Sequence, residues 1–157
     1  MSQSQAPARK AASPKVQILA PAEGESLDVM GTPILVKSGD PAAPFIVEHA
    51  IPVGFHVPLH FHEAEDESFY VLEGEVTFEC DDGIAHVGPG GFVHCPRGAR
   101  HGFRNETDRP ARALVVASAG GGLGPMFREF DRTVRGGAPL TPAAMSSIAA
   151  ENRIHIL

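Results

Sequence analysis

Residues 54–74 read GFHVPLHFHEAEDESFYVLEG and hold two runs of strand-forming residues on either side of a short acidic segment. Successive side chains of an extended strand point to opposite faces, so His60 and His62 share one face while Phe61 points to the other. Two imidazoles on the same face of a strand can bind one metal ion. The first run therefore predicts two ligands of a metal site.

Glu67 follows His62 by an odd number of positions, which would put it on the opposite face if a single strand continued. The intervening segment is polar, and we interpret it as a chain reversal. Glu67 then begins a second strand that faces the two histidines and runs to a tight turn at Gly74. Glu65 and Asp66 lie in the same reversal and are alternative carboxylate ligands, but Glu67 alone begins the regular strand run.

A second stretch, residues 90–105, supplies a fourth candidate ligand, because His101 follows a turn at Pro96–Gly98 and lies in a later strand run. The fixed positions of the two stretches are Gly54, His60, His62, Glu67 and Gly74, then Gly90, Pro96, Gly98, His101 and Asn105. This pair of patterns resembles the two motifs of the cupin superfamily. The resemblance implies an all-β fold, a small antiparallel double-stranded β-helix of the cupin or jelly-roll type. It also implies a metal site of three histidines and one carboxylate, formed by His60, His62, Glu67 and His101.

The composition excludes several classes of function. With 157 residues, 43% hydrophobic and 20% charged, the chain has the size and balance of one globular domain with a substantial core. A net charge of −6 without a basic stripe argues against nucleic acid as a partner. No apolar run is long enough to cross a bilayer, and residues 1–15 lack the apolar core of a secretory signal. We therefore expect a cytoplasmic protein.

We expect the chain to have three parts. Residues 1–15 are rich in Ser, Gln, Ala, Pro and Lys and are interpreted as a flexible N-terminal tail. Residues 16–118 form the predicted β-barrel, with a candidate first strand at 16–19 and the last strand at 111–117. Residues 119–157 form a short helical extension that packs on the barrel.

The extension starts with the glycine-rich run 120–124, which lacks the Lys-Ser/Thr ending of a phosphate loop. We interpret this run as a flexible exit from the barrel. Residues 125–134 predict a helix, because their apolar side chains fall at helical spacing. These side chains are Met126, Phe127, Phe130 and Val134.

A second helix is predicted from Thr141 to Asn152. Thr141 is typical of an N-cap, and Pro142 is typical of the first helical position. The apolar residues 154–157 that follow are expected to dock on the protein.

The remaining histidines and the cysteines are assigned other roles. His56 shares the parity of the candidate ligands, but Pro58 makes that parity unreliable, so we interpret His56 as a pocket-rim or surface residue. His94 lies beside the second motif without filling its histidine position and is interpreted as structural. Cys80 and Cys95 are not at a metal-binding spacing and are expected to be buried free thiols.

Three neutral imidazoles and one carboxylate leave a divalent ion with a net charge of about +1, which favours an enolate, phenolate or carboxylate as ligand. The ligand set suits one divalent transition metal (Fe, Ni, Co, Mn, Cu or Zn) and leaves positions for substrate, water or dioxygen. Phe69, Val71 and Phe103 are expected to surround the site and exclude water.

Within the superfamily, residues 65–75, residues 91–98 and the helical tail after Gly124 resemble small cupins related to quercetin 2,3-dioxygenase. That resemblance implies an oxidoreductase in which the three histidines hold the metal. Glu67 is then both a ligand and the catalytic base that takes the proton of an enolic hydroxyl. Dioxygen attacks, and the ring opens with loss of carbon monoxide. Cupins of this kind commonly form homodimers, so a homodimer is expected.

Two other functions fit the same residues. A metal-dependent isomerase, epimerase or lyase of a small sugar or acid would use the ion as a Lewis acid without oxygen. Tyr70 is a possible proton donor for such a reaction, but its parity places it on the face opposite Glu67. A non-enzymatic ligand-binding cupin is the other alternative, although a regulator is disfavoured because no DNA-binding helical unit is recognised. In each case the partner is a small molecule.

Overall fold

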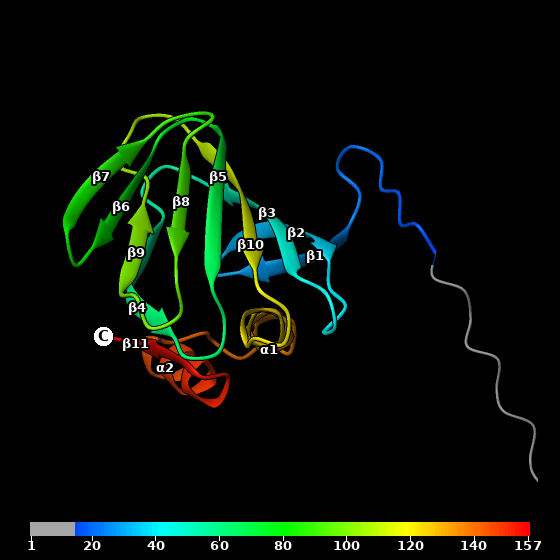
Figure 1. Cartoon of the computed structure of the whole chain (residues 1–157). Coiled ribbons are helices and arrows are strands. Elements are labelled where there is room, and N and C mark those ends of the chain that lie inside the picture. The colour runs from blue at the N-terminus through cyan, green and yellow to red at the C-terminus, as the bar shows by residue number, and fades with distance from the viewer. Residues whose placement is uncertain (1–14) are drawn as a thin grey trace, which may run out of the picture.

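The computed structural model describes residues 15–157, and two antiparallel sheets form its body (Figure 1). One sheet has the strand order β1-β2-β3-β10-β5-β8, and the other has the order β11-β4-β9-β6-β7. The predicted tail at 1–15 falls, except for Lys15, outside the described residues. In chain order the elements are β1 (Glu25–Val29), β2 (Thr32–Ser38), β3 (Phe45–Ile51), β4 (His56–His62), β5 (Glu67–Glu73), β6 (Val76–Cys80), β7 (Gly83–Val87), β8 (Phe92–Cys95), β9 (His101–Arg104), β10 (Ala111–Ala117), α1 (Leu123–Arg135), α2 (Pro142–Glu151) and β11 (Ile154–Ile156).

The core lies between the two sheets. In β3 and β10 every second residue is buried, because alternate side chains of a strand point to the same face. Strand β10 pairs with β3 on one side and β5 on the other, so segments far apart in the sequence lie side by side. The predicted all-β fold with a short C-terminal helical segment is confirmed.

The turn after β5 requires a glycine. Gly74 has a φ of +70°, in the left-handed region that other residues rarely adopt. A Cβ at this position would also lie 2.6 Å from the carbonyl oxygen of Pro110 and 2.8 Å from the Cβ of Ala111. The strand that begins at Glu67 therefore ends at this turn, as predicted.

Strand β4 is irregular around Pro58, as the proline in the sequence led us to expect. The pairing of β4 with β9 shifts register between Val57 and His60, and proline has no N–H to donate to the ladder. Beyond the shift His60 pairs with His101, which brings two candidate ligands together on adjacent strands.

Residues 16–19 do not form the predicted first strand. They have no regular secondary structure, and the side chains of Val16 and Ile18 are 87% and 86% exposed. The first strand is β1, which starts at Glu25 and pairs with β2. The strand-like composition of residues 16–19 does not by itself produce a strand, because a strand is stabilised by pairing with and packing against a neighbouring strand.

Helix α1 begins earlier than predicted, inside the glycine-rich run. A Cβ at Gly121 would overlap the carboxylate of Glu65, and a Cβ at Gly122 would overlap the carbonyl oxygen of Asn152. These glycines allow close packing of the connection, and the end of the run lies in the helix and not in an exit segment.

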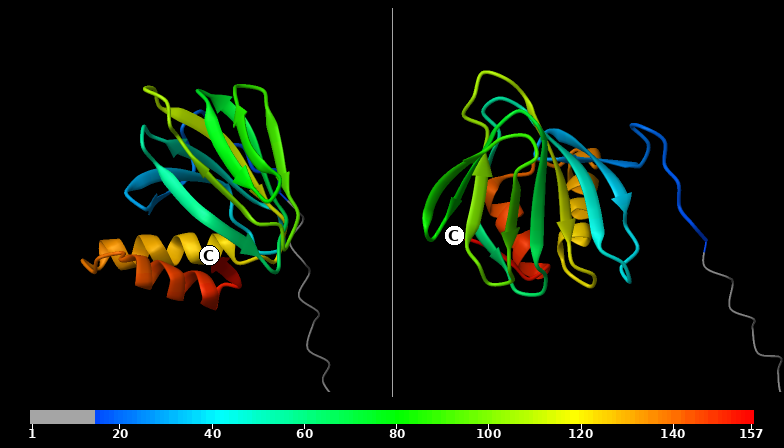
Figure 2. Two further views of the ribbon diagram at one scale, coloured as in Figure 1. Left: turned by 90° about the vertical axis from the view of Figure 1, so that its left-hand side faces the viewer. Right: turned by 45° about the horizontal axis from the view of Figure 1, so that its top comes forward.

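Helices α1 and α2 lie together beneath one end of the barrel (Figure 2). The apolar stripe of α1 packs inward at Met126, Phe127 and Phe130, whereas Val134 is 38% exposed. The ring of Phe127 meets that of Phe45 edge-on with centroids 6.1 Å apart, which ties the helix to β3. Within the described residues, neither helix is long and apolar enough to cross a membrane.

The cap of α2 is confirmed. The Oγ1 of Thr141 accepts a hydrogen bond from the N–H of Ala144 at 3.2 Å, and Pro142 is the first helical residue. The chain then forms β11, a strand that composition alone did not predict. Ile154 pairs with the position of His62 and Ile156 with that of His60, so the C-terminal segment docks on β4.

Candidate metal centre

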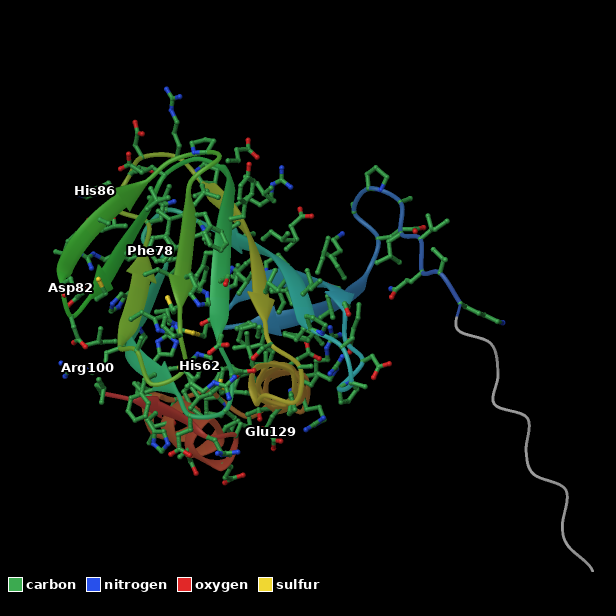
Figure 3. All side chains as sticks on the ribbon, in the orientation of Figure 1. His62, Phe78, Asp82, His86, Arg100 and Glu129 are labelled. Atoms are coloured by element: carbon green, nitrogen blue, oxygen red, sulfur yellow. The ribbon has the colours of Figure 1, made fainter. Side chains whose placement is uncertain are left out.

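The two histidines at the end of β4 point into the barrel. His60 is 7% exposed and His62 is 2% exposed, while Phe61 between them faces the other side and stacks on the ring of His155. Figure 3 places His62 where the barrel meets the C-terminal helices. The alternation predicted for this run is confirmed.

Glu67 begins β5 and is buried on the inner face of that strand. Phe69 follows on the same face and is fully buried, whereas Tyr70 is 45% exposed. Asp66 points to the surface, where its carboxylate accepts a hydrogen bond from the Nε of Arg97 at 3.2 Å. The chain reversal therefore sends Glu67 inward and Asp66 outward.

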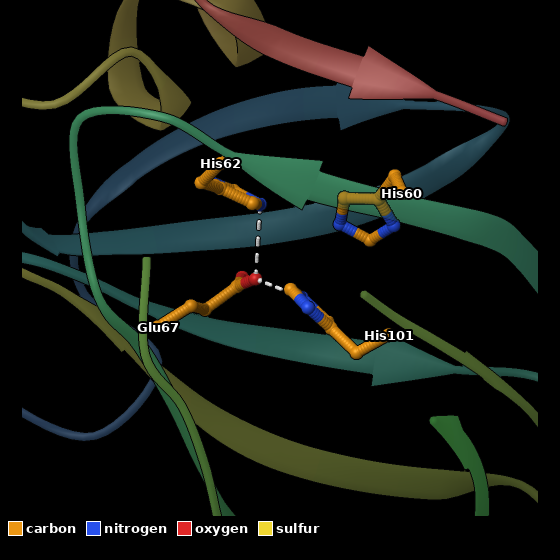
Figure 4. Close-up of side chains that lie close together, drawn as sticks. All are labelled: His60, His62, Glu67 and His101. Atoms are coloured by element: carbon orange, nitrogen blue, oxygen red, sulfur yellow. Dashed lines mark hydrogen bonds and ion pairs between the residues drawn. The ribbon is translucent and has the colours of Figure 1, made fainter. Parts of the chain in front are cut away.

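His101 begins β9 and completes a cluster with the other three side chains (Figure 4). The Oε2 of Glu67 lies 2.9 Å from the Nε2 of His101 and 3.2 Å from the Nε2 of His62. Two ligand atoms at right angles around an ion, each ~2.1 Å from it, are about 3.0 Å apart, so this spacing fits a single ion. The four residues that the sequence pattern selected are thus together, with ligand atoms all within 4.8 Å of one another: His60, His62, Glu67 and His101.

Backbone carbonyls fix the tautomers of two imidazoles. The Nδ1 of His60 lies 2.9 Å from the carbonyl oxygen of Pro58, and the Nδ1 of His101 lies 3.0 Å from that of Ala99. A carbonyl oxygen only accepts, so each Nδ1 carries the proton and donates it. When these rings are neutral, their Nε2 atoms therefore present lone pairs to the centre.

The third imidazole is fixed by a buried carboxylate. The Oε1 of Glu65 accepts a hydrogen bond from the Nδ1 of His62 at 2.8 Å. The same oxygen accepts from the N–H groups of Gly122 at 3.2 Å and Leu123 at 2.9 Å, at the N-terminus of α1. A helix N-terminus favours a carboxylate, because unpaired N–H groups and the helix dipole both attract negative charge.

Glu65 therefore lies on the far side of His62 from the centre and orients that ligand. The sequence left Glu65 open as an alternative ligand and did not predict this role. Its partner N–H groups come from the N-terminus of α1, 57 and 58 positions later in the chain, and no local pattern connects the two segments.

A cation at the centre would remove the repulsion between ligand atoms that face one another. In the neutral form of His101, with its proton on Nδ1, the Nε2 of this ring and the Oε2 of Glu67 are two lone-pair atoms only 2.9 Å apart. The Nε2 of His62 is fully buried and has no hydrogen-bond partner among the described residues. Facing acceptors repel unless a proton or a cation lies between them. Because three imidazoles and one carboxylate suit divalent transition metals, the cluster can hold such an ion.

Burial and charge act in opposite directions on the pKa values of the cluster. Burial lowers the pKa of His60 to about 4. Burial also disfavours the charged forms of His62 and His101, but hydrogen bonds and the nearby Glu67 carboxylate raise their pKa values to about 9 and about 10. Burial alone would raise the pKa of Glu67, yet the two histidines lower it. Protons and a metal ion therefore compete for the same atoms.

The other histidines and cysteines considered in the sequence lie outside the cluster. His56 is exposed, as predicted, and His94 is exposed with its Nδ1 2.9 Å from the hydroxyl of Ser68. Both cysteines are free thiols, and Cys95 is buried as predicted. Cys80 is exposed, contrary to expectation, because it is the last residue of β6 at the hairpin to β7.

An apolar cavity opens on the cluster. Its volume is about 130 Å³. His60 and Glu67 line one part, and the C-terminal elements α1, α2 and β11 close another. An apolar cavity that meets a few polar groups is typical of a small-molecule site.

His49 of β3 is a polar residue of this cavity that the sequence reasoning missed. It is 3% exposed, and its Nδ1 lies 2.7 Å from the carbonyl oxygen of Ala50. Burial lowers its pKa. The alternation Phe45, Val47, His49, Ile51 was a sufficient signal, because it places all four side chains on one strand face.

Residues 47–117 match the family model of the cupin domain. The chain is also 31% identical over 101 residues to the quercetin 2,3-dioxygenase of Bacillus subtilis (strain 168). That alignment covers 64% of this chain and 29% of the relative, so the chain spans less than a third of the curated protein that it matches.

Solved structures with different activities share the fold. The polyketide cyclase RemF from Streptomyces resistomycificus has a TM-score of 0.59 at 26% identity, over 66% of this chain and 80% of that one. A sugar phosphate isomerase from Silicibacter pomeroyi DSS-3 has a TM-score of 0.52 at 30% identity, over 56% of this chain and 59% of that one. Because these activities differ, the shared fold does not fix the reaction. The matched family model, the two facing antiparallel sheets and these similarities show that residues 47–117 form a cupin domain.

Proposed function

We propose that this chain is a metal-dependent enzyme that acts on a small aromatic or enolic molecule, by a dioxygenase reaction of the quercetinase type. In this proposal one divalent transition metal is held by His60, His62, Glu67 and His101. One observation carries it: the cluster lies at the wall of an apolar cavity, and two of its members line that cavity. A ligand in the cavity would therefore reach the metal directly.

Glu67 is positioned to accept a proton from such a ligand. Bound at the centre, a divalent transition metal would supply a Lewis acid with positions open to an anionic oxygen and to dioxygen. The Oε2 of Glu67 faces His62 and His101, whereas its Oε1 has no hydrogen-bond partner within the described part of the chain. The lowered pKa keeps this carboxylate ionised but makes it a weak base, so Oε1 would receive the proton of an enolic hydroxyl only after that hydroxyl is acidified by a bound metal.

The cavity walls favour an apolar, planar molecule. Phe55, Phe69 and Phe103 contribute aromatic surface, and the helices add Phe127 and Phe130. Exclusion of water by these side chains strengthens electrostatic interactions at the centre. No lysine or arginine is among the described residues that line the cavity, so a phosphate group would meet no positive side chain there.

The similarity to quercetin 2,3-dioxygenase makes flavonols the first ligands to test. We expect flavonols, added without oxygen to protein loaded with each candidate metal in turn, to show a shifted absorption band. Admission of oxygen should then consume dioxygen and flavonol together and release carbon monoxide. An unchanged spectrum across a panel of flavonols and other enols, with metal content verified, would contradict the proposal.

An oxygen-independent reaction is the second candidate. The polyketide cyclase and the sugar phosphate isomerase share this fold at 26% and 30% identity, which supports Lewis-acid chemistry without dioxygen. An apolar substrate fits the cavity better than a sugar phosphate does, because no lysine or arginine among the described lining residues would pair with a phosphate group. Substrate turnover at a silent oxygen electrode would select this alternative.

The homodimer is also part of the proposal. Val16 and Ile18 expose most of their apolar surface, and a second copy could cover it. Light scattering coupled to size-exclusion chromatography is expected to give twice the mass of the chain, and a single-chain mass at micromolar concentration would contradict it.

A further inference from the structure

His49 is held in place at the cavity wall by aromatic side chains. Its ring meets that of Phe55 edge-on with centroids 5.2 Å apart, and that of Phe103 with centroids 5.8 Å apart. Both phenylalanines line the same cavity, as does His49 itself. The imidazole therefore has a fixed orientation in an apolar wall, and it is not one of the four clustered side chains.

The hydrogen bond at Nδ1 determines what the other ring nitrogen can do. The carbonyl oxygen of Ala50 only accepts, so the Nδ1 of His49 carries a proton and donates it at 2.7 Å. Burial lowers the pKa of this imidazole, so the ring is neutral. The Nε2 atom is then an acceptor with a free lone pair, and it has no hydrogen-bond partner among the described residues.

A polar atom in an apolar wall is normally satisfied by a partner. The Nε2 of His49 differs from the Nε2 of His62, which is sealed from the surroundings, because His49 faces space that a ligand can occupy. An acceptor in this position selects a neutral donor, such as a hydroxyl group, and disfavours a second anionic group.

We propose that the Nε2 of His49 accepts a hydrogen bond from a hydroxyl group of the substrate, at a point distinct from the oxygen that reaches the metal centre. This inference rests on the proposed function, because it assumes a ligand held at His60 and Glu67 in the same cavity. The substrate class is then a planar aromatic molecule with two separate hydroxyl groups: an acidic one at the centre and a neutral one at His49. A second phosphate or carboxylate group would be rejected.

The test compares ligands that differ in one hydroxyl group. The probes are 3-hydroxyflavone and its monohydroxylated derivatives, in which the second hydroxyl occupies each ring position in turn. Binding is measured by absorption titration on zinc-loaded protein, since zinc has no redox activity. One derivative is expected to bind at least about tenfold more tightly than 3-hydroxyflavone, because a site built to pair with a hydroxyl rejects the analogue that lacks it.

The substitution His49→Phe should remove this preference and leave the bound zinc at the wild-type level. The matched control is His56→Phe, which changes an exposed histidine outside the cavity and should keep the preference. A preference that survives His49→Phe, or no preference in the wild type among derivatives that bind, would overturn the inference. If zinc is not retained by the wild-type protein, the proposed metal centre itself has failed.

A second measurement follows His49 in the wild-type protein itself. In wild-type protein with ¹⁵N-labelled histidine, the Nε2 resonance of His49 is expected to shift toward the hydrogen-bonded position when the preferred derivative binds. The resonance is assigned to His49 because it is absent from the spectrum of the variant His49→Gln. Glutamine retains an acceptor group at this position. A bound derivative that leaves this resonance in place would also overturn the inference.

Discussion

Replacing Glu65 by glutamine should weaken metal binding although Glu65 does not face the metal centre. The carboxylate accepts three hydrogen bonds, from the Nδ1 of His62 and from the N–H groups of Gly122 and Leu123. The substitution Glu65→Gln keeps the shape of the side chain and removes its charge. The imidazole of His62 then keeps a neutral acceptor at Nδ1 but loses the charged partner that makes its Nε2 a better donor to a metal.

The size of the effect follows from these hydrogen bonds. A bond to a charged group contributes ~1.5–3 kcal/mol and a neutral one ~0.5–1.5 kcal/mol, so each bond is weakened by about 1 kcal/mol. For the bond to His62 this corresponds to a loss of metal affinity of roughly fivefold, since about 1.36 kcal/mol is tenfold, and it lies just below the ~10–100-fold range for such partners. The two bonds to α1 should lower the stability of the metal-free protein by about 2 kcal/mol, or about 4–8 °C in Tm.

The assay is competition for zinc against a chromophoric chelator, with thermal unfolding followed by circular dichroism. The matched control is Asp66→Asn, which removes the neighbouring carboxylate that pairs with Arg97 at the surface. This control should keep wild-type zinc affinity. Equal affinities for the wild type, Glu65→Gln and Asp66→Asn would refute the assignment of Glu65 as the residue that orients His62.

Three further predictions concern the centre. His62→Ala or His101→Ala should each lose most of the bound metal and retain the β-sheet circular dichroism spectrum, and unchanged metal in both by elemental analysis would refute the ligand assignment. In metal-free protein, the pKa values of about 9 for His62 and about 10 for His101 mean that the folded state binds protons that the unfolded state releases above its pKa of about 6.5. Stability measured by urea unfolding should therefore be highest near pH 6.5 and fall as pH rises toward 10, while metal-loaded protein should fall less. It should also fall below pH 6.5, because the unfolded state protonates His60 there and the folded state, in which the pKa of His60 is about 4, does not. A flat metal-free profile would contradict this. Gly121→Ala should lower both Tm and zinc affinity, because the added Cβ would overlap the Glu65 carboxylate. A variant with the wild-type Tm would contradict this, because the connection to α1 would then have shifted to accept the Cβ.

Local patterns predicted the positions that depend on strand alternation. His60, His62 and Glu67 are buried because each lies on the inner face of a regular run, and the sequence shows that alternation directly. Gly74 was predictable for a similar reason, since a tight turn after a strand calls for a residue that tolerates positive φ. His49 follows the same rule and could have been found by counting in twos along β3.

Positions that depend on distant partners were not predictable. Glu65 is a buried partner of His62 only because the N-terminus of α1 supplies two N–H groups to it. The strand β11 exists only because β4 offers it an edge. In contrast, residues 16–19 have strand-like composition and meet no edge, so they remain irregular. Tertiary pairing decided these three cases, and no local pattern carried that information.

The most direct measurement is an anomalous difference map from a crystal of the metal-loaded protein, recorded at the absorption edge of the metal found by elemental analysis. The account predicts one strong peak per chain, about 2.1 Å from an Nε2 atom of each of three histidines and from a carboxylate oxygen of Glu67. Those histidines are His60, His62 and His101. A map with no peak among these atoms, or with the metal bound elsewhere on the chain, would contradict it.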